Sequence, residues 1–299
     1  LEVGSSKPRK KYARTFLEKL GVGEIGEKEL VQTILQKEYS TADRPLKKTD
    51  HIAHLKRFMK LIDADSSCRS IFQNCNIFLG FDGKWHDART IYLDSPFLET
   101  GLKEYYDNIG YPDGFSSLSD FYLESKVEIQ SLTRFAENLG AQRIFEIEKT
   151  SCQGNPQWNY LQNVSGKAWS DHAINKDFRI PGFSKLIANK SVRISKLIWV
   201  TLSTKCQLQY SQYLKAQYRL NLRGSYRQAP SQLIHGLRTQ AWVPQSGDFV
   251  RPAAARAELL PDGFTFDPGW AWIKEIEFGK EAELESERAE AAASEAAEG

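Results

Sequence analysis

The stretch IFLGFDGKWHDA at residues 77–88 sets the architecture, because AWVPQSGDFVRP at residues 241–252 spells the same element again. In each copy an apolar run leads to a polar turn with a glycine, and an aromatic residue then opens a second run. Glycine allows the positive φ that a tight turn requires, so the pattern predicts two short strands joined as a hairpin. The aligned pairs are Gly83 with Gly247, Trp85 with Phe249, Phe78 with Trp242 and Leu79 with Val243.

Each predicted hairpin follows a predicted helix and precedes a segment with proline and apolar residues, IYLDSPFLETGL or LLPDGFTF. A module used twice is more typical of a scaffold than of an active site. We therefore predict an α+β fold, mainly helical, with two tandem modules that each contain a short antiparallel β-hairpin. The predicted segments are an N-terminal helical hairpin at 1–45, a first module at 46–170, a second module at 171–275, and an acidic helical or disordered tail at 276–299.

Apolar periodicity predicts the main helices. KKYARTFLEKLGV and EKELVQTILQKEYS form the N-terminal pair, and DHIAHLKRFMKLI follows with Asp50 as its N-cap. Residues 116–139 are helical or mixed, and FEIEK at 145–149 alternates like an edge strand. Residues 191–220 are expected to form two helices interrupted near residues 201–206.

Composition excludes several classes of protein. The chain has 299 residues, of which 41% are hydrophobic, and this length fits two domains better than one. No apolar run approaches the roughly 20 residues of a membrane span, so we expect a soluble, cytoplasmic protein. The four cysteines form no CxxC pair and read as buried or incidental thiols. The chain opens at Leu1 and not at Met, and we expect it to be a fragment.

Charge is strongly segregated along the chain. The net charge is +2, yet residues 274–299 carry nine Glu against Lys274, Lys280 and Arg288. No Asp or Glu occurs between Asp177 and Asp248. Such an acid-free stretch presents positive potential to a polyanion.

The candidate binding residues lie in this acid-free stretch, chiefly at 185–238. The basic candidates are Lys185, Lys190, Arg193, Lys196, Lys205, Lys215, Arg219, Arg223, Arg227 and Arg238. Four tyrosines lie among them and suit stacking on bases: Tyr210, Tyr213, Tyr218 and Tyr226. Three interpretations stay open: contact with nucleic acid, docking of an acidic protein or of the chain's own acidic tail, or simple solvation of a basic helix.

Other chemistries have weaker support. His51 and His54 are three apart on a predicted helix and could join His86 at a metal, but polar positions at the edge of the apolar face explain them better. FEIEK lacks the spacing of a nuclease site, and no serine or cysteine nucleophile motif occurs. The glycine-rich LGVGEIG at 20–26 suits a phosphate-binding turn between helices, although a helix C-cap is the simpler interpretation. We predict no catalytic residues and no metal site.

Four strings resemble one known family. LGVGEIGEKELVQTIL, HIAHLKRFMKLI, IYLDSPFLETGLKEYY and LRTQAWVPQSGDFVRPAAARAELLPDGF, spread over residues 14–280, resemble the region downstream of the ATP-binding domain in bacterial sacsin-like proteins. Their ATPase belongs to the superfamily of the ninety-kilodalton heat-shock chaperone, gyrase and histidine kinases. The chain has neither the DxGxG loop of that superfamily nor a GxxxxGK[ST] loop.

The resemblance implies a non-catalytic scaffold or coupling region of a larger ATPase, acting in chaperone-like remodelling or in bacterial defence against foreign DNA. ATP and magnesium are then expected only in an upstream domain, which becomes the main partner of this chain. The alternative is a nucleic-acid-binding module that uses the acid-free stretch. An acidic protein or DNA is the further partner expected, and a membrane is not.

Overall fold

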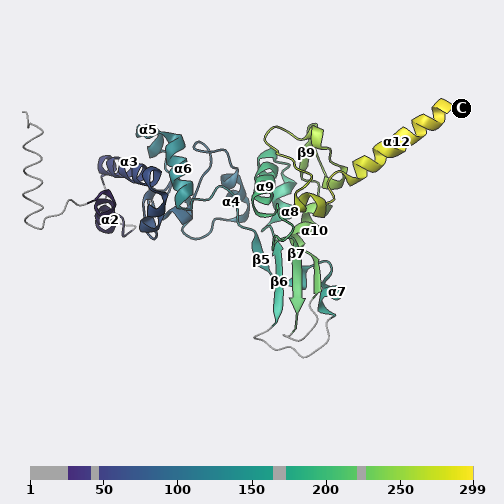
Figure 1. Ribbon diagram of the computed structural model, residues 1–299, viewed down its shortest axis with the longest axis horizontal. Coiled ribbons are helices and arrows are strands. Elements are labelled where there is room, and N and C mark those ends of the chain that lie inside the picture. The colour runs from purple at the N-terminus through teal and green to yellow at the C-terminus, as the bar shows by residue number, and fades with distance from the viewer. Residues whose placement is uncertain (1–25, 42–46, 164–172, 221–226, 299) are drawn as a thin grey trace, which may run out of the picture. The chain divides into compact units, whose positions relative to one another are not determined.

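The computed structural model describes residues 26–41, 47–163, 173–220 and 227–298 (Figure 1). They divide into two compact units, one made of residues 26–91 and 118–141 and the other of residues 92–117 and 142–298. These limits differ from the four predicted segments, because residues 92–117 and 142–163, predicted in the first module, belong to the second unit. Helix α6 (Ile129–Leu139) lies in the first unit. The first predicted helix and most of LGVGEIG lie outside the described residues. Among the described helices none is long and apolar enough to cross a membrane.

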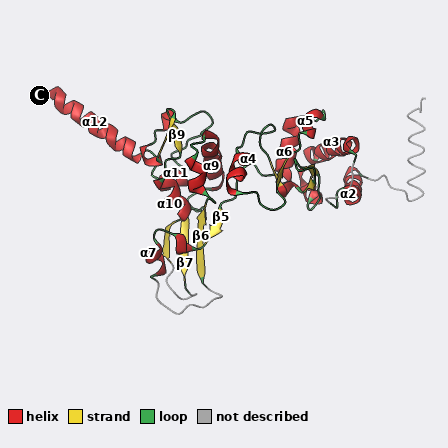
Figure 2. Cartoon of the chain, turned by 180° about the vertical axis from the view of Figure 1, so that it is seen from behind, coloured by secondary structure: helices red, strands yellow, loops and turns green. Residues whose placement is uncertain are grey.

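The first unit is mainly helical (Figure 2). Its elements are α2 (Glu27–Glu38), α3 (Lys48–Ala64), the 3-10 helix η1 (Ser66–Phe72), β1 (Phe78–Leu79), β2 (Trp85–His86), the 3-10 helix η2 (Ala88–Thr90), α5 (Phe121–Glu124) and α6. Helix α3 begins at Lys48, two residues before the predicted cap, so Asp50 lies in its first turn, where its charge favours the positive end of the helix.

The core of the first unit is a chain of aromatic rings. Of the apolar residues that the spacing places on one face of α3, Leu55, Phe58 and Ile62 are buried, while Ile52 and Met59 are half-buried. Phe72 lies 5.4 Å from Phe58 between ring centroids and 5.8 Å from Phe135 on α6. These contacts join α3, η1 and α6. Helix α6 is therefore part of this core, although 56 residues lie between the end of η1 and its own start.

The second unit combines helices with a four-stranded antiparallel sheet in the order β5-β6-β7-β8. Its helices and 3-10 helices are α4 (Leu102–Ile109), η3 (Cys152–Gly154), α7 (Trp158–Gln162), α8 (Phe183–Ala188), α9 (Val192–Lys205), α10 (Gln232–Thr239), η5 (Pro252–Ala254), η6 (Ala257–Leu259), α11 (Ala271–Glu275) and α12 (Lys280–Glu298). Its strands are β5 (Glu148–Thr150), β6 (Ile174–Arg179), β7 (Lys215–Arg219), β8 (Arg227–Pro230), β9 (Val243–Gln245) and β10 (Asp248–Val250). Two short strands, β3 (Ile91–Tyr92) and β4 (Ser116–Ser117), pair with each other.

The sheet corrects one prediction. Helix α9 forms as expected, with the Ser191 side chain capping it, but the second helix predicted before residue 220 is strand β7. Leu208, which contributed to the apparent helical stripe, is 74% exposed. Pairing with β6 and β8 therefore overrides the local spacing. FEIEK does contribute an edge strand, β5, as predicted.

Three tryptophans centre the core of the second unit. Trp199 on α9 is 1% exposed and packs edge to face on Trp272 of α11, 4.9 Å away between ring centroids. Trp242, at the start of the second hairpin, lies 6.1 Å from Trp199. Ser195 fixes this hairpin by donating to the Trp242 carbonyl at 2.7 Å.

Both predicted hairpins form, but their turns differ. Strands β1 and β2 enclose residues 80–84, where the Gly83 N–H donates to the Gly80 carbonyl at 3.0 Å and Gly83 has φ +79°. Strands β9 and β10 are joined by Ser246 and Gly247 alone, with φ of 48° and 86°, which is a type I′ turn. The shorter turn shifts the strand register by one residue. Each hairpin leads into a 3-10 helix, η2 or η5, so the repeated element extends beyond the turn.

Candidate nucleic-acid interface on the four-stranded sheet

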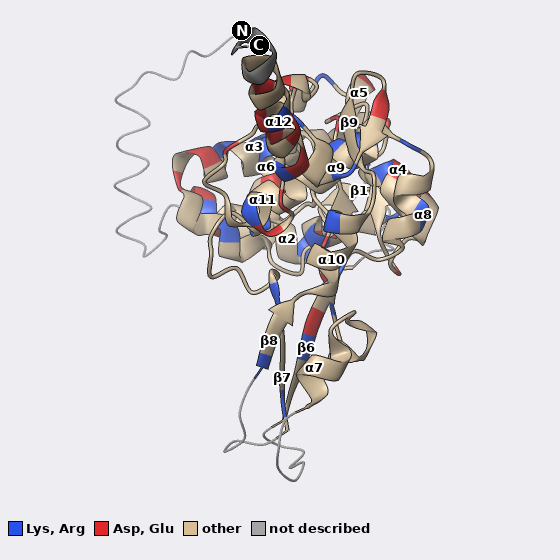
Figure 3. Ribbon diagram, turned by 90° about the vertical axis from the view of Figure 1, so that its right-hand side faces the viewer, with Lys and Arg blue, Asp and Glu red and all other residues tan. Residues whose placement is uncertain are grey.

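The acid-free stretch is largely neutralised by carboxylates from other parts of the second unit. In Figure 3 the ribbon positions of lysine and arginine (blue) are interspersed with those of aspartate and glutamate (red). The ion pairs are Lys190 with Asp248 (2.7 Å), Arg193 with Asp94 (3.5 Å), Lys205 with Glu146 (2.5 Å), Lys215 with Glu275 (2.6 Å) and Arg238 with Glu277 (3.9 Å). Half of the ten predicted basic residues thus stabilise the fold or balance charge within it.

The other predicted basic residues separate into two groups. Lys185 donates to the Asn108 carbonyl, and Lys196 lies against Gly263. Arg219 and Arg227 lie at the end of the sheet away from α10, and among the described residues no carboxylate pairs with either side chain. Arg223 and Tyr226 fall outside the described residues.

The two faces of the sheet are covered differently. On one face Ala216 and Ala229 pack with Leu161 beneath α7, and Tyr218 lies 5.0 Å from Trp158 between ring centroids. Arg227 extends over the Tyr160 ring on this same side, 4.8 Å from its centroid. This face is therefore closed by α7, and Tyr218 is a packing residue.

The opposite face is open and polar. Strand alternation places Lys215, Gln217 and Arg219 on it, and Gln217 pairs across the ladder with Gln228. Lys176 of β6 pairs with Gln217 in the ladder and donates to the Gln212 side chain at 2.8 Å. The Nε atom of Arg219 is buried and has no hydrogen-bond partner among the described residues.

A groove of about 630 Å³ runs between this open face, the 209–212 loop and α11. Its lining is rich in planar amides and carries more basic than acidic side chains: Gln209, Gln212, Gln217, Gln228, Lys215, Lys274 and Glu275. Tyr210 borders the groove and is 94% exposed, so its ring has a free face. The remaining candidate, Tyr213, packs on Phe178 at 5.0 Å and is not available for stacking.

The sequence thus identified Tyr210, Lys215 and Arg219 but not Lys176 or the glutamines of this face. Lys176 lies before the acid-free stretch, and the glutamines carry no charge that a scan for basic residues detects. Their signal is compositional, since Gln207, Gln209, Gln212, Gln217 and Gln228 fall within 22 residues.

A buried carboxylate anchors the sheet to the helices. Asp177 is 0% exposed and accepts from the Asn155 and Gln232 side chains at 2.8 and 2.9 Å, and from the Phe178 and Gln232 backbone N–H groups at 2.7 and 3.0 Å. Four donors satisfy this charge without a cation. Asp177 is thus a structural connection between β6, η3 and α10.

The first unit buries His51, one of the histidines weighed as a metal ligand. Its Nδ1 lies 3.0 Å from the Tyr39 hydroxyl and its Nε2 lies 3.0 Å from the Tyr122 hydroxyl. The Tyr39 hydroxyl also lies 3.1 Å from Nδ1 of His54. His86 is 2.9 Å from Asp82. Both nitrogens of His51 are therefore engaged by tyrosines, and the described residues contain no cluster suited to a metal ion.

The hydrogens in this network have one consistent direction. The Leu79 N–H donates to the Tyr122 oxygen at 2.8 Å, so the buried Tyr122 hydroxyl hydrogen must go to His51 Nε2. His51 then donates from Nδ1 to Tyr39, which donates to His54. Burial lowers the pKa of His51 to about 3, and burial also lowers the pKa of His54. His51 is thus held neutral.

The comparisons with known proteins give no family assignment: the chain matches no protein-family model, no curated protein and no solved structure.

Proposed function

We propose that the second unit binds single-stranded nucleic acid through the open face of its four-stranded sheet. The observation that carries this proposal is Tyr210, which is 94% exposed beside a groove of planar amides and basic side chains. An aromatic ring with a free face offers a stacking surface to any base. The groove volume of about 630 Å³ suits one or two nucleotides.

The groove and the open face beside it supply the other contacts that a single strand needs. Lys274 in the groove lining, together with Lys176 and Arg219 on the open face, offers donors to phosphates. The glutamine amides can both donate to and accept from base edges. A single strand fits better than a duplex because its bases are free to stack and to present their edges. Neutralisation of most of the basic stretch limits the number of phosphate contacts to about three, so we expect a modest salt dependence.

The test is fluorescence anisotropy with a labelled oligothymidine of ~12 nucleotides. We expect a micromolar Kd at about 50 mM salt that weakens about 20-fold at about 200 mM, as three phosphate contacts imply. Tyr210→Ala should weaken binding at least fivefold through lost stacking. The matched control is Tyr160→Ala, since Tyr160 is 52% exposed and belongs to α7, the helix that covers the opposite face of the sheet.

Two results would refute this proposal. Absence of binding at about 50 mM salt would remove the interface altogether. Equal weakening by Tyr210→Ala and Tyr160→Ala would show that the open face has no special role.

A second candidate function is the one that the resemblance implies: a non-catalytic, cytoplasmic coupling region of a sacsin-like ATPase, with ATP and magnesium bound by another domain. It is favoured by the buried polar groups Asp177 and His51, whose hydrogen-bonding partners all belong to the fold. The test is calorimetric titration of this chain with a sacsin-like ATP-binding domain, with and without nucleotide. Affinity that changes with nucleotide supports coupling, and no binding in either state contradicts it.

A further inference from the structure

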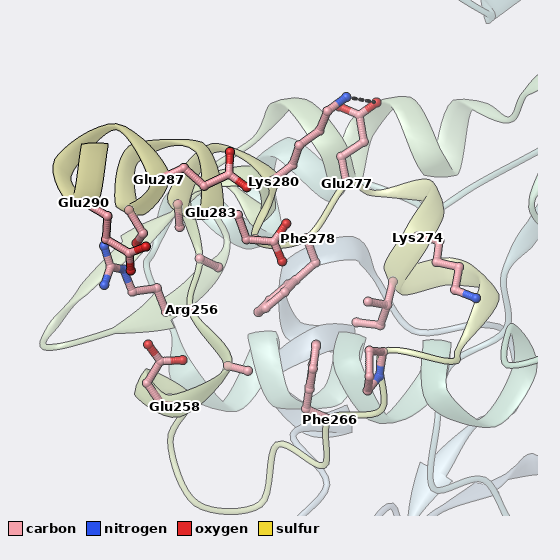
Figure 4. Close-up of a pocket in the computed structure, with 17 residues that line it drawn as sticks. Arg256, Glu258, Phe266, Lys274, Glu277, Phe278, Lys280, Glu283, Glu287 and Glu290 are labelled. Carbon is pink, nitrogen blue, oxygen red and sulfur yellow. Dashed lines mark ion pairs between the residues drawn. The ribbon is translucent and has the colours of Figure 1, made fainter. Parts of the chain in front are cut away.

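We propose that a groove at the base of α12 binds a basic, amphipathic segment of a partner protein. The groove has a volume of about 790 Å³ and lies between α11, the first turns of α12 and the chain near η6 (Figure 4). It shares only Lys274 with the groove on the sheet. The proposal goes beyond the function proposed above, because five glutamates line this groove against three basic side chains.

The floor of the groove is apolar. Phe266 and Phe278 point into it in Figure 4, with ring centroids 5.0 Å apart, and neither ring is fully buried. The Phe278 ring centroid lies 5.8 Å from that of Trp199, so the floor of the groove packs against the tryptophan core. Two aromatic rings at the bottom of an open groove leave apolar surface that a partner side chain can cover.

One wall is a row of carboxylates on a single face of α12. Glu283, Glu287 and Glu290 line the groove at positions i, i+4 and i+7, so they are about one helical turn, ~5.4 Å, apart along the axis. Glu258 faces them from η6. The Lys280 charge is already paired with Glu277 at 3.8 Å.

Helix α12 has no described partner along most of its length. Ala282 is buried and Glu281 pairs with Arg251, but residues 287–294 are all exposed. Leu284 is 45% exposed. A helix of this composition forms through the intrinsic propensity of Ala and Glu, so one face remains free for a partner.

Charge complementarity identifies the occupant. A partner helix with Lys or Arg one turn apart matches the carboxylate row, and its apolar face can reach Phe266 and Phe278. The same carboxylates repel a phosphate backbone, which excludes nucleic acid from this groove.

The probe is a fluorescein-labelled helical peptide of ~15 residues built from Lys, Leu and Ala, with Lys one turn apart on one face and Leu on the other. Titrated with the full chain at about 50 mM salt, it should bind with a micromolar Kd. Glu287→Lys should weaken binding about fivefold, because an attraction becomes a repulsion. The same peptide with Ser in place of Leu should bind at least tenfold more weakly, because it has no side chains for the aromatic floor.

Glu285→Lys is the matched control. It changes the charge of α12 by the same amount two positions away, which is on the opposite face of the helix, and Glu285 does not line the groove. An effect below twofold is expected. Equal effects of Glu285→Lys and Glu287→Lys would show unspecific attraction to an acidic helix and would overturn the proposal, as would absence of peptide binding.

One further variant tests whether the chain fills its own groove. The chain carries a run of basic residues near its N-terminus, Arg9, Lys10 and Lys11. Replacing these three residues by Gln should leave peptide affinity unchanged. Tighter binding of the peptide to this variant would show that the chain's own basic segment occupies the groove, and it would overturn the proposal of a partner protein. Since the peptide and the oligothymidine are separate probes of separate grooves, failure of one proposal is distinguishable from failure of the other.

Discussion

A decrease in pH should destabilise the first unit through His51. In the folded state, the hydrogen bonds of Tyr39 and Tyr122 to the His51 ring leave no acceptor for a second ring proton. Protonation requires His51 to donate from both nitrogens, yet the Tyr122 oxygen already accepts the Leu79 N–H. The Tyr122 hydroxyl would then keep a buried hydrogen without an acceptor. The unfolded chain has no such constraint and binds the proton freely.

The sign and size follow from linkage. The pKa of His51 is lowered from 6.5 to about 3 on folding, so between these values the unfolded state binds more protons. The stabilising contribution is therefore complete above pH 6.5 and is lost as pH falls toward 3. Each decrease of one pH unit in this window lowers the free energy of unfolding by up to ~1.4 kcal/mol. The decrease between pH 6.5 and pH 4.5 is therefore about 2.7 kcal/mol.

Native-state hydrogen exchange measured by mass spectrometry can test this, because it reports the free energy of opening for each segment. Peptides from α3 and α6 report on the first unit, and peptides from α9 provide the reference in the second. The comparison variant is His51→Phe, which removes the titrating group. At pH 7 it should lower stability by about 1–3 kcal/mol, since the Tyr122 hydroxyl loses its acceptor.

The decisive quantity is the stability difference between wild type and His51→Phe as a function of pH. It should decrease by about 2.7 kcal/mol between pH 7 and pH 4.5. Only in the wild type does folding hold the residue 51 side chain unprotonated at a pH where the unfolded chain binds the proton. Carboxylates that titrate in the same range affect both proteins alike and cancel. A difference that stays constant within about 0.5 kcal/mol would refute the assignment of His51 as the responsible group.

Three further substitutions test the fold by urea unfolding. Gly247→Ala should lower the free energy of unfolding by about 1–2 kcal/mol through backbone strain alone, because φ is +86° and nothing lies within 4 Å of the added carbon. An unchanged free energy of unfolding would contradict the type I′ turn. Asp94→Ala should lower the free energy of unfolding by about 2–4 kcal/mol, because the Asp94 carboxylate accepts from four backbone N–H groups before and within the first turn of α4. A decrease below about 1 kcal/mol would contradict this role of the carboxylate. Lys215→Ala should lower the free energy of unfolding by less than about 1 kcal/mol although its ion pair with Glu275 is short, because both side chains reach solvent. A larger decrease would show that this ion pair stabilises the fold.

The hairpins could be predicted because their information is local. A glycine with positive φ and the flanking apolar runs lie within a dozen residues, and both turns form where the pattern places them. The four-stranded sheet could not be predicted in the same way. Strand β7 reads KAQYR, without β-branched residues, and its partners β6 and β8 supply the hydrogen bonds that make it a strand.

The candidate binding site shows the same division between local and distant information. Tyr210 was identified from its position among basic residues, and its exposure agrees with that role. The neutralisation of the basic stretch was not foreseeable, because Arg193 pairs with Asp94 and Lys205 with Glu146, about 100 and 59 residues away. A run of like charge in sequence therefore predicts a surface of like charge only when no distant carboxylate reaches it.

The two grooves of the second unit share one side chain, and this permits a test in which a single change acts in opposite directions. Lys274 at the end of α11 lines both the polar groove of the sheet and the acidic groove of α12. Lys274→Gln removes a positive charge, so oligothymidine should bind about twofold more weakly and the basic peptide about twofold more tightly. A general loss of structure cannot produce this result, since it would weaken both ligands. If both affinities change in the same direction, at least one groove has been assigned the wrong charge preference.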